Sequence, residues 1–350
     1  MVQLSTPPSR TAVTIAMIQQ CPSFAYVTLL TRPSYLAGLL VLHQSLRAVH
    51  SMYDLVVMIP PTLPQETRDV LRRCRITVRE VEWLHPPAGK YTPHQRDAHY
   101  IDTWTKLRHV VLTTTCVLLW ALTASGLFYQ SIRTDGKIVL LDVDMLILRN
   151  MDELMDIDIP SDGIAATHVC ACNPRRLDHY PIDWEPMNCA HSSVKSPHSP
   201  PPLIRKDSPR PYHQLNSGTV VLRPSYALAE GLQAILLSQD LSQWNFPDQD
   251  LLAAYFKDRW IPLPWYYNAL RSLRNTHPVM WSDREIRCLH YIFPEKPWHN
   301  RDLPTDLLSQ AGFAMMNRWW WERFDPLVKR LRKTDSKSYY TLVKTMQRSK

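Results

Sequence analysis

Glycine is scarce in this chain: only 8 of its 350 residues are glycine, and none belongs to a glycine-rich phosphate loop. The dinucleotide-binding pattern GxGxxG and the Walker pattern GxxxxGK[ST] both depend on closely spaced glycines, because the backbone has to approach the phosphates. Both patterns are missing here. Any nucleotide that this chain binds must therefore have its phosphates held by side chains and a metal ion.

Several targeting and partner signals are also missing. The seven cysteines are an odd number without regular spacing, which argues against a secreted disulfide framework and for a reduced cytosolic compartment. Residues 1–24 contain no charged stretch followed by an apolar one, so we expect an N-terminal extension without a secretory signal and a cytoplasmic protein. We expect no nucleic-acid partner, because most of the net charge of +8 lies in residues 318–350 and no nucleic-acid motif is present.

Apolar periodicity predicts strands that alternate with helices. The expected strands are 25–30, 54–59, 76–81, 138–141 and 219–223, and the expected helices are 35–49, 64–73, 226–238 and 248–257. Strand, helix and strand joined by short links imply a mostly parallel sheet with right-handed crossovers. The chain is 45% hydrophobic, which is enough for a large core, so the expected class is α/β.

Two carboxylates close the apolar run Ile138 to Leu141. Asp142 and Asp144 are two residues apart, so in an extended chain they project to the same side at the carboxyl end of the strand, where parallel sheets bind ligands. Two neighbouring carboxylates are costly unless they share a proton or a cation, and their oxygens suit Mg²⁺ or Mn²⁺. The pair predicts a divalent metal site, although Asp-x-Asp also occurs in ordinary surface turns.

Other motifs follow the acidic pair along the chain. They are Asn216-Ser217-Gly218, Asp248-Gln249-Asp250, Leu263 to Asn268, and His290 with Lys296-Pro297-Trp298. Together with Ala25 to Thr31, Tyr35 and Gly38, these motifs resemble glycosyltransferase family 8, the retaining enzymes that include glycogenin and galactinol synthase. The resemblance runs from Ala25 to Trp298.

The resemblance implies a GT-A-type, Rossmann-like nucleotide-diphospho-sugar transferase fold over residues 25–300, with a mostly parallel central sheet. It also implies metal-dependent, retaining transfer of glucose or galactose from a UDP-sugar to an acceptor hydroxyl. Cys170-Ala171-Cys172, and Asn268 followed by His277-Pro278, resemble galactinol synthase more than glycogenin, which favours a small polyol or saccharide as acceptor. A glycogenin-like glucosyltransferase and a catalytically impaired nucleotide-sugar-binding relative are the alternatives, and homo-oligomers are compatible with any of these.

The resemblance also assigns roles to individual residues. The implied ligands of Mn²⁺ or Mg²⁺ are Asp142, Asp144 and His290. The implied donor-binding residues are Leu29, Thr31, Tyr35, Lys106, Val143, Ser217 and Lys296, with Lys296 on the β-phosphate. The implied catalytic residues are Asn216, Asp248 and Gln249, with Asp248 stabilising the developing cation or orienting the acceptor.

Three departures from the family pattern bear on activity. Phe293 stands three residues after the histidine, where members usually have glycine, and Asn245 replaces an acid of glycogenin-like members. The third is an extra apolar segment of about residues 109–128, which we interpret as an insertion or a retained intron. Val110 to Tyr129 lacks charge and is long enough to span a bilayer, so a membrane-anchored transferase is a further alternative.

Two more segments have open interpretations. The Pro- and Cys-rich stretch 168–213 is expected to be a long insertion loop. Its cysteines Cys170, Cys172 and Cys189 are interpreted as ordinary buried thiols, with a structural zinc or a local disulfide as alternatives. Residues 301–350 are expected to be a basic, solvated and partly helical tail. The alternative is a tail that contacts a membrane surface through Trp319-Trp320-Trp321.

Overall fold

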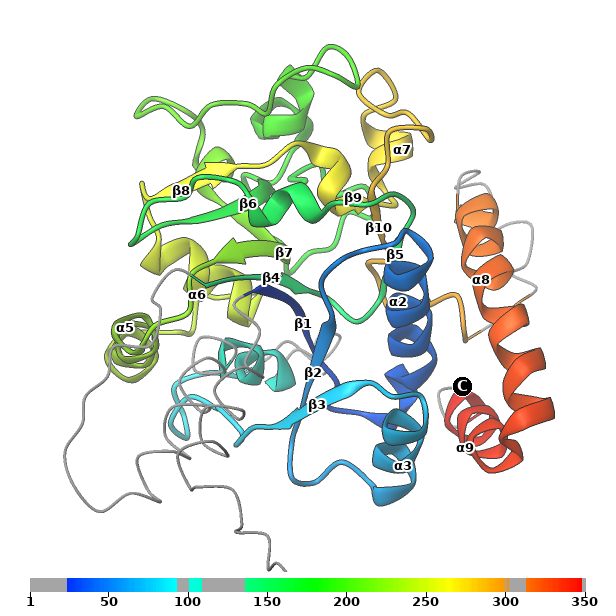
Figure 1. Ribbon diagram of the computed structural model, residues 1–350. Helices are drawn as coiled ribbons and strands as arrows, with labels where there is room; N and C mark the ends of the chain where they lie inside the picture. Colours follow the sequence, from blue (N-terminus) through cyan, green and yellow to red (C-terminus); the bar gives the residue numbers. More distant parts are fainter. Residues whose placement is uncertain (1–23, 93–100, 109–135, 300, 302–312, 348–350) are drawn as a thin grey trace, which may run out of the picture.

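The computed structural model describes residues 24–92, 101–108, 136–299, 301 and 313–347. Within these residues, a seven-stranded sheet forms the middle layer of the molecule (Figure 1). The strands lie in the order β3-β2-β1-β4-β7-β6-β8. Their bounds are β1 Phe24–Leu29, β2 Leu55–Ile59, β3 Thr77–Glu80, β4 Lys137–Leu141, β6 Ile164–His168, β7 Leu215–Leu222 and β8 Trp260–Pro262.

The direction of β7 decides which residues meet at one edge of this sheet. β7 pairs antiparallel with β4 and β6, whereas the other pairings in the sheet are parallel, so the predicted mostly parallel sheet is confirmed. Because β7 is reversed, its first residues lie beside the last residues of β4. The backbone N–H of Asp142 donates to the carbonyl of Gly218 at 3.0 Å.

A second, three-stranded sheet brings distant parts of the chain to the same edge. It contains β5 Met145–Ile147, β9 Ala269–Leu270 and β10 Cys288–His290, with β10 in the middle. In the antiparallel register of β5 and β10, His290 pairs with Met145, the residue after Asp144. These strands are too short to show a hydrophobic period in the sequence, so sequence analysis did not predict them.

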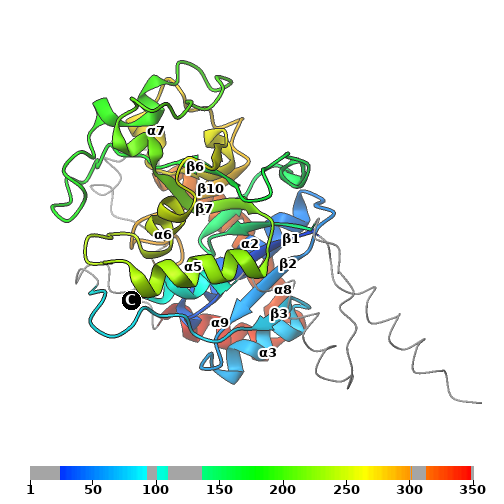
Figure 2. The same cartoon turned by 90° about the vertical axis from the view of Figure 1, so that its left-hand side faces the viewer.

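Helices cover the two faces of the large sheet, as Figures 1 and 2 show from two sides. One face carries α2 Leu36–Ala48, α3 Gln65–Arg73, α8 Phe313–Thr334 and α9 Ser336–Gln347. The other face carries α5 Tyr226–Ser238 and α6 Pro247–Tyr255, while α7 Leu273–Thr276 lies near the small sheet. The two helices before β3 and the helices 226–238 and 248–257 were predicted from periodicity, to within two residues at either end.

Alternate residues of the central strands separate the two cores. Val139 and Leu141 of β4 belong to the cluster that contains α2 and α8, and Ile138 and Leu140 belong to the cluster that contains α5 and α6. This is the period of two that a strand buried on both faces requires, and it explains the continuous apolar run before Asp142.

The expectation of a solvated C-terminal tail is wrong for α8 and α9. Apolar residues recur in α8 at spacings of three and four, and they are buried against the core; they are Phe313, Met316, Trp320, Phe324, Leu327 and Leu331. The charged residues that suggested a tail occupy the opposite side of this amphipathic helix. Trp320 is 1% exposed and stacks on Phe324 with ring centroids 4.7 Å apart, so it is a core residue and no membrane anchor.

Residues 168–213, which start at the last residue of β6, form a loop with only short 3₁₀ turns. These turns are η4 Pro186–Asn188, η5 Ala190–Ser193 and η6 Arg210–His213. The loop has a small core of its own in which Val169, Ala171, Trp184 and Cys189 are buried.

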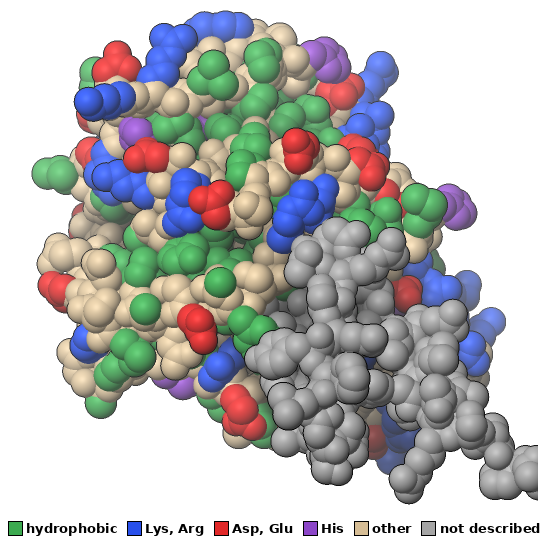
Figure 3. Space-filling model, turned by 60° about the vertical axis from the view of Figure 1, so that its left-hand side comes forward, with side chains coloured by type: hydrophobic (Ala, Val, Ile, Leu, Met, Phe, Trp, Pro, Cys, Tyr) green, Lys and Arg blue, Asp and Glu red, His purple; other side chains and the backbone are tan. Residues whose placement is uncertain are grey.

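The apolar segment 109–128 and most of the N-terminal extension 1–24 lie outside the described residues. Among the helices that the structure does describe, none combines the length and the apolar character needed to span a bilayer. On the face shown in Figure 3, basic and acidic side chains are interspersed, so this face does not present a field of one sign.

Candidate functional site

One cavity of about 230 Å³ lies at the edge of the sheet where the carboxyl end of β4 meets the beginning of β7. Every candidate site residue from the sequence analysis lines this cavity, namely Leu29, Thr31, Tyr35, Lys106, Asp142, Val143, Asp144, Asn216, Ser217, Asp248, Gln249, His290 and Lys296. They come from segments up to 267 positions apart, between Leu29 and Lys296. The sheet topology therefore brings the predicted set together.

Strand ends and one helix start position these side chains. Leu29 and Thr31 lie at the carboxyl end of β1, and Asp142 directly follows β4. Asn216 and Ser217 lie at the start of the reversed strand β7, so they share this edge. The first turn of α6 supplies Asp248 and Gln249, after Pro247 at the first helical position.

Three ligand atoms converge at the centre of the cavity. The Nε2 atom of His290 lies 3.6 Å from Oδ2 of Asp142 and 3.4 Å from Oδ1 of Asp144. Ligands about 2.1 Å from an octahedral cation are roughly 3 Å apart, so these atoms need to close by only about 0.5 Å to share one ion. The donor set of two carboxylates and one imidazole therefore fits a divalent ion of the Mn²⁺ or Mg²⁺ type.

Asn268 holds His290 in the form that a metal requires. Its Nδ2 donates to Oγ1 of Thr167 at 3.1 Å and to Oδ1 of Asn216 at 2.6 Å, which leaves Oδ1 of Asn268 facing His290. The Nδ1–H of His290 donates to that oxygen at 2.9 Å. The proton is thus on Nδ1, and the lone pair of Nε2 points at the two carboxylates.

Two buried lysines neutralise the remaining carboxylate oxygens. Lys106 Nζ lies 2.6 Å from Oδ1 of Asp142 and 2.8 Å from Oδ2 of Asp248, and Lys296 Nζ lies 2.5 Å from Oδ2 of Asp144. Each acid of the pair therefore gives one oxygen to a lysine and turns the other toward His290.

The pKa values of these groups follow from burial and pairing. Burial works against the charge of Lys106, but the carboxylates of Asp142 and Asp248 outweigh it and raise the pKa of this lysine. Burial raises the pKa of Asp142 despite its contact with Lys106. Burial would also raise the pKa of Asp144, but the ammonium of Lys296 holds that pKa well below its usual range. Asp144 is therefore ionised under ordinary conditions and ready for a cation.

A hydrogen-bonded chain links His290 to α6. Asn216 Nδ2 donates to Oε1 of Gln249 at 3.1 Å, and Oδ1 of Asn216 accepts from both Asn268 and the backbone N–H of Gly218. Burial would raise the pKa of Asp248, but its pair with Lys106 lowers it. The three predicted catalytic residues are thus held rigidly on one wall, and Asp248 is negatively charged.

Gly218 allows His290 to reach the acidic pair. A Cβ atom at position 218 would lie 2.7 Å from the His290 ring and 2.8 Å from Met145. Gly38 has the same role beneath Trp298, which contacts Tyr35 edge-on with ring centroids 5.6 Å apart. Both glycines adjoin residues that line the cavity, His290 at position 218 and the backbone of Val143 at position 38.

Phe293 keeps the backbone conformation of a glycine. Its φ angle is +77°, in the left-handed region that side chains with a Cβ rarely adopt. The guanidinium of Arg175 lies 3.9 Å above the centre of its ring, and Phe293 also lines the cavity. The departure from the family pattern therefore changes the side chain while the strained turn is retained.

Sequence reasoning missed residues that complete the site. Asn268 was noted in a motif and in the resemblance to galactinol synthase but was given no role, because its contact with His290 depends on the register of the small sheet. Asn173, Tyr180 and Trp184 from the loop 168–213 line the cavity on the side of Phe246. Trp184 stacks on Phe246 at 5.2 Å, and no pattern in the sequence connects these two positions.

Comparisons with known proteins agree with this geometry. The family model described as glycosyl transferase family 8 matches residues 26–302. Galactinol synthase 1 of Solanum lycopersicum is 28% identical over 91% of this chain and 87% of its own length, and galactinol synthase 6 of Arabidopsis thaliana is 28% identical over 86% and 80%. Among solved structures, the galactosyltransferase LgtC in complex with donor and acceptor sugar analogues has a TM-score of 0.54 at 15% identity, covering 86% of this chain and 95% of that one.

Proposed function

The chain belongs to glycosyltransferase family 8, and from this premise we propose that it transfers a hexose from a UDP-sugar to an acceptor hydroxyl, with a divalent metal and with retention of anomeric configuration. The predicted family, the GT-A-type α/β fold and glycosyltransferase activity are confirmed by the family match and the structural similarity. The donor, the metal and the acceptor are the proposed part.

The observation that carries the proposal is the convergence of Asp142, Asp144 and His290 on one point in the cavity. An ion bound there, proposed to be Mn²⁺, supplies positive charge where negative charge grows on the departing diphosphate. The imidazole ligand favours Mn²⁺ over Mg²⁺, which prefers oxygen ligands.

Lys296 and Lys106 supply charge from the protein itself. Lys296 is buried beside Asp144, so its ammonium lies at the metal edge of the cavity, in reach of a phosphate bound there. Lys106 holds Asp142 and Asp248 together, which fixes the distance between the metal site and the acid that we assign to the reacting face. Leu29, Thr31 and Tyr35 form the side of the cavity that we assign to the uridine.

A small polyol is the proposed acceptor, and galactose is favoured over glucose as the transferred sugar. The similarity to proteins named galactinol synthase supports both choices. The cavity wall formed by Tyr180, Trp184 and Phe246 is aromatic, and such walls suit the apolar face of a ring. A glycogenin-like reaction is less well supported, because Asn245 replaces the acid of those members and uses its backbone N–H to bind Asp250 at 2.9 Å.

The test is product formation by the purified chain. UDP-galactose or UDP-glucose is supplied with Mn²⁺, Mg²⁺ or EDTA and with inositol, glycerol or maltose, and both UDP and the glycosylated product are measured. We expect Mn²⁺-dependent product, and we expect the variant Asp142→Asn/Asp144→Asn to lose at least about 100-fold in rate, because the charge on the leaving phosphate is no longer stabilised.

The matched control is Asp162→Asn/Asp258→Asn, whose side chains are 65% and 69% exposed. This double variant makes the same chemical change away from the cavity and should keep the wild-type rate. Equal rates in Mn²⁺ and in EDTA would contradict the metal-dependent mechanism.

Phe293 favours one second candidate, a relative that binds the nucleotide sugar and transfers it poorly. Its ring lies on the cavity wall where the family pattern has no side chain. Mn²⁺-dependent UDP binding without turnover, together with turnover gained in Phe293→Gly, would support this candidate over an active enzyme.

A further inference from the structure

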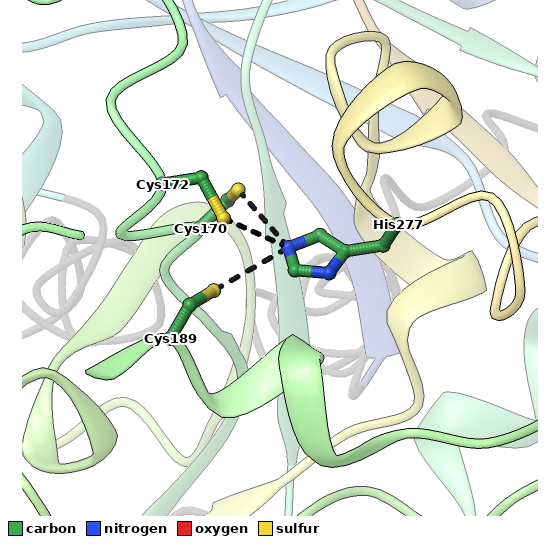
Figure 4. A group of neighbouring side chains, drawn as sticks. All are labelled: Cys170, Cys172, Cys189 and His277. Carbon is green, nitrogen blue, oxygen red and sulfur yellow. Dashed lines mark hydrogen bonds between the residues drawn. The ribbon is translucent and has the colours of Figure 1, made fainter. Parts of the chain in front are cut away.

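Three cysteines and a histidine meet outside the Asp142 site. Cys170 and Cys172 follow β6, Cys189 lies between η4 and η5, and His277 follows α7. Figure 4 shows all three sulfur atoms directed at the Nε2 atom of His277. One ligand atom from each residue lies within 4.8 Å of the other three. From this arrangement we propose that the four residues bind one structural Zn²⁺ ion.

The distances match a tetrahedral zinc site. The Nε2 atom of His277 lies 3.6 Å from Sγ of Cys170, 3.2 Å from Sγ of Cys172 and 3.5 Å from Sγ of Cys189. With zinc–sulfur bonds of about 2.3 Å and a zinc–nitrogen bond of about 2.0 Å, tetrahedral geometry places nitrogen and sulfur roughly 3.5 Å apart. The ligand atoms therefore already occupy the corners of a site of the right size.

The chemistry of the set selects zinc over the ions proposed for the catalytic cavity. Three thiolates and one imidazole are soft and borderline ligands, which suit Zn²⁺ and disfavour Mg²⁺ or Mn²⁺. Four protein ligands fill a tetrahedral shell, so no position is left open for substrate. The site is structural rather than catalytic.

The alternatives considered from the sequence explain this arrangement less well. All three cysteines are free thiols in the structure, so no disulfide joins them. Ordinary buried thiols have no reason to gather around one imidazole nitrogen from three separate segments. Cys189 is fully buried and His277 is 7% exposed, so bulk water does not satisfy these groups.

The zinc ion would hold in place the loop that forms one wall of the active-site cavity. Cys170 itself lines the cavity, and Asn173, Tyr180 and Trp184 of the same loop form the wall that faces the proposed acceptor. This loop contains no α-helix or β-strand between residues 169 and 213. Four bonds to one ion would connect the loop to both α7 and β6. These bonds would replace the backbone hydrogen bonds of helices and strands, which the loop lacks.

Metal content of the full-length chain tests the proposal directly. After expression with zinc and gel filtration, we expect about one zinc per chain by mass spectrometry, since all four ligands of a closed structural site are present. Exchange for Co²⁺ should give the sulfur-to-cobalt charge-transfer absorption of a tetrahedral thiolate site. This spectrum is recorded on the unmodified protein, so it does not depend on the folding of a variant.

Variants separate this site from others in the chain. Loss of an outer-shell partner alone often costs about 10–100-fold in metal affinity, and Cys172→Ser and His277→Ala each remove a direct ligand. Both variants should therefore bind zinc at least about tenfold more weakly, as measured by competition with a chelator. Cys74→Ser and His213→Ala are matched controls away from the cluster and should keep the metal. Asp142→Asn/Asp144→Asn should keep it too, because that variant removes ligands only from the catalytic site.

Two results would overturn the proposal. One is a metal-free chain whose Co²⁺-treated form lacks the charge-transfer band. The other is an intact mass of the unreduced protein that shows a disulfide between any two of Cys170, Cys172 and Cys189. Neither result depends on transferase activity, so failure of the zinc site and failure of the proposed function are distinguishable.

Discussion

The side chain of Asn268 decides how His290 can act. Asn268 accepts the Nδ1–H of the histidine and so aims the lone pair of Nε2 at Asp142 and Asp144. If Asn268 is changed to Ala, the ring loses this orientation, and the Mn²⁺ concentration for half-maximal activity should rise by about 10–100-fold. Excess Mn²⁺ should restore most of the rate.

The measurement for Asn268→Ala is a Mn²⁺ titration of product formation, with thermal unfolding recorded in parallel. Asn188→Ala is the control, because the side-chain amide of Asn188 donates within the loop 168–213, to Asp183 and Glu185. An unchanged Mn²⁺ requirement in Asn268→Ala would show that the histidine is not positioned in this way.

Phe293 makes a second prediction at the scale of one residue. At its φ of +77°, a residue with a Cβ is strained by about 1–2 kcal/mol and glycine is not. Phe293→Ala loses the contact with Arg175 and keeps the strain, whereas Phe293→Gly loses the contact and relieves it. The Gly variant should therefore be more stable than the Ala variant by about 1 kcal/mol in urea unfolding. Elsewhere in folded chains the order is usually the reverse, so an Ala variant that is the more stable one would contradict the account.

At the scale of single residues, the sequence predicted those site residues whose type and motif are recognisable. Asp142, Asp144, His290 and Lys296 belong to such motifs, and the structure brings them together as expected. Their roles in binding and transfer stay predictions. Asn268 and His277 were visible but unassigned, because their partners lie 22 to 107 positions away and become neighbours only through strand register and loop packing.

Helix α8 differs most from what the sequence predicted. Its apolar stripe packs on α2 and on Trp298, so the C-terminal helices are part of the folded domain. Replacing Phe324 by Ala should cost about 3 kcal/mol of unfolding free energy, because a buried ring is removed from a packed cluster. Urea unfolding measures this cost.

Lys329→Ala, on the exposed side of α8, is the control and should stay within about 0.5 kcal/mol of the unmodified chain. If α8 were a solvated tail, the two variants would be equally stable.

Helix α6 contains a carboxyl whose protonation affects stability. Asp250 accepts backbone N–H groups of Asn245 and Phe246 at 2.9 and 2.8 Å, yet burial raises its pKa from 3.8 to about 7. Between these pH values the folded state holds a proton that the unfolded state has released. The free energy of unfolding should therefore contain a contribution that decreases as pH rises from about 4 to 7.

Urea unfolding at pH 5.5 and pH 7.5 tests this contribution. Asp250→Asn cannot release the proton, so the unmodified chain should lose stability relative to this variant as pH rises. Parallel pH dependence in the two proteins would show that Asp250 titrates normally.

Elements were predictable where they are long or continuously apolar. The strands β1 to β4 and the helices α2, α3, α5 and α6 appear with nearly the expected bounds, because burial imposes a period that the sequence has to carry. The strand β7 begins four residues before its predicted start, and β6 and β8 were not predicted. The strands β5, β9 and β10 have two or three residues each, which is less than the length over which such a period shows. The charge of α8 concealed its apolar stripe.

At the scale of the whole molecule, the site exists because of one reversed strand. β7 runs antiparallel to its neighbours, so its start lies beside the carboxyl end of β4, at the same edge of the sheet where β1 also ends. The small sheet then adds His290, and the loop 168–213 closes the far wall. The apolar segment 109–128 falls between Lys106 and β4, outside the described residues, and whether it is an insertion or a retained intron stays a prediction that the transcript can test.

The most direct test of the account is calorimetric titration of the purified chain with UDP, with and without Mn²⁺. We predict that Mn²⁺ tightens UDP binding at least about tenfold, a gain of about 1.4 kcal/mol, and that Asp144→Asn abolishes this difference. Equal affinity for UDP in Mn²⁺ and in EDTA, or an Mn²⁺ effect that survives in Asp144→Asn, would contradict the claim that these residues form one metal-dependent nucleotide-sugar site.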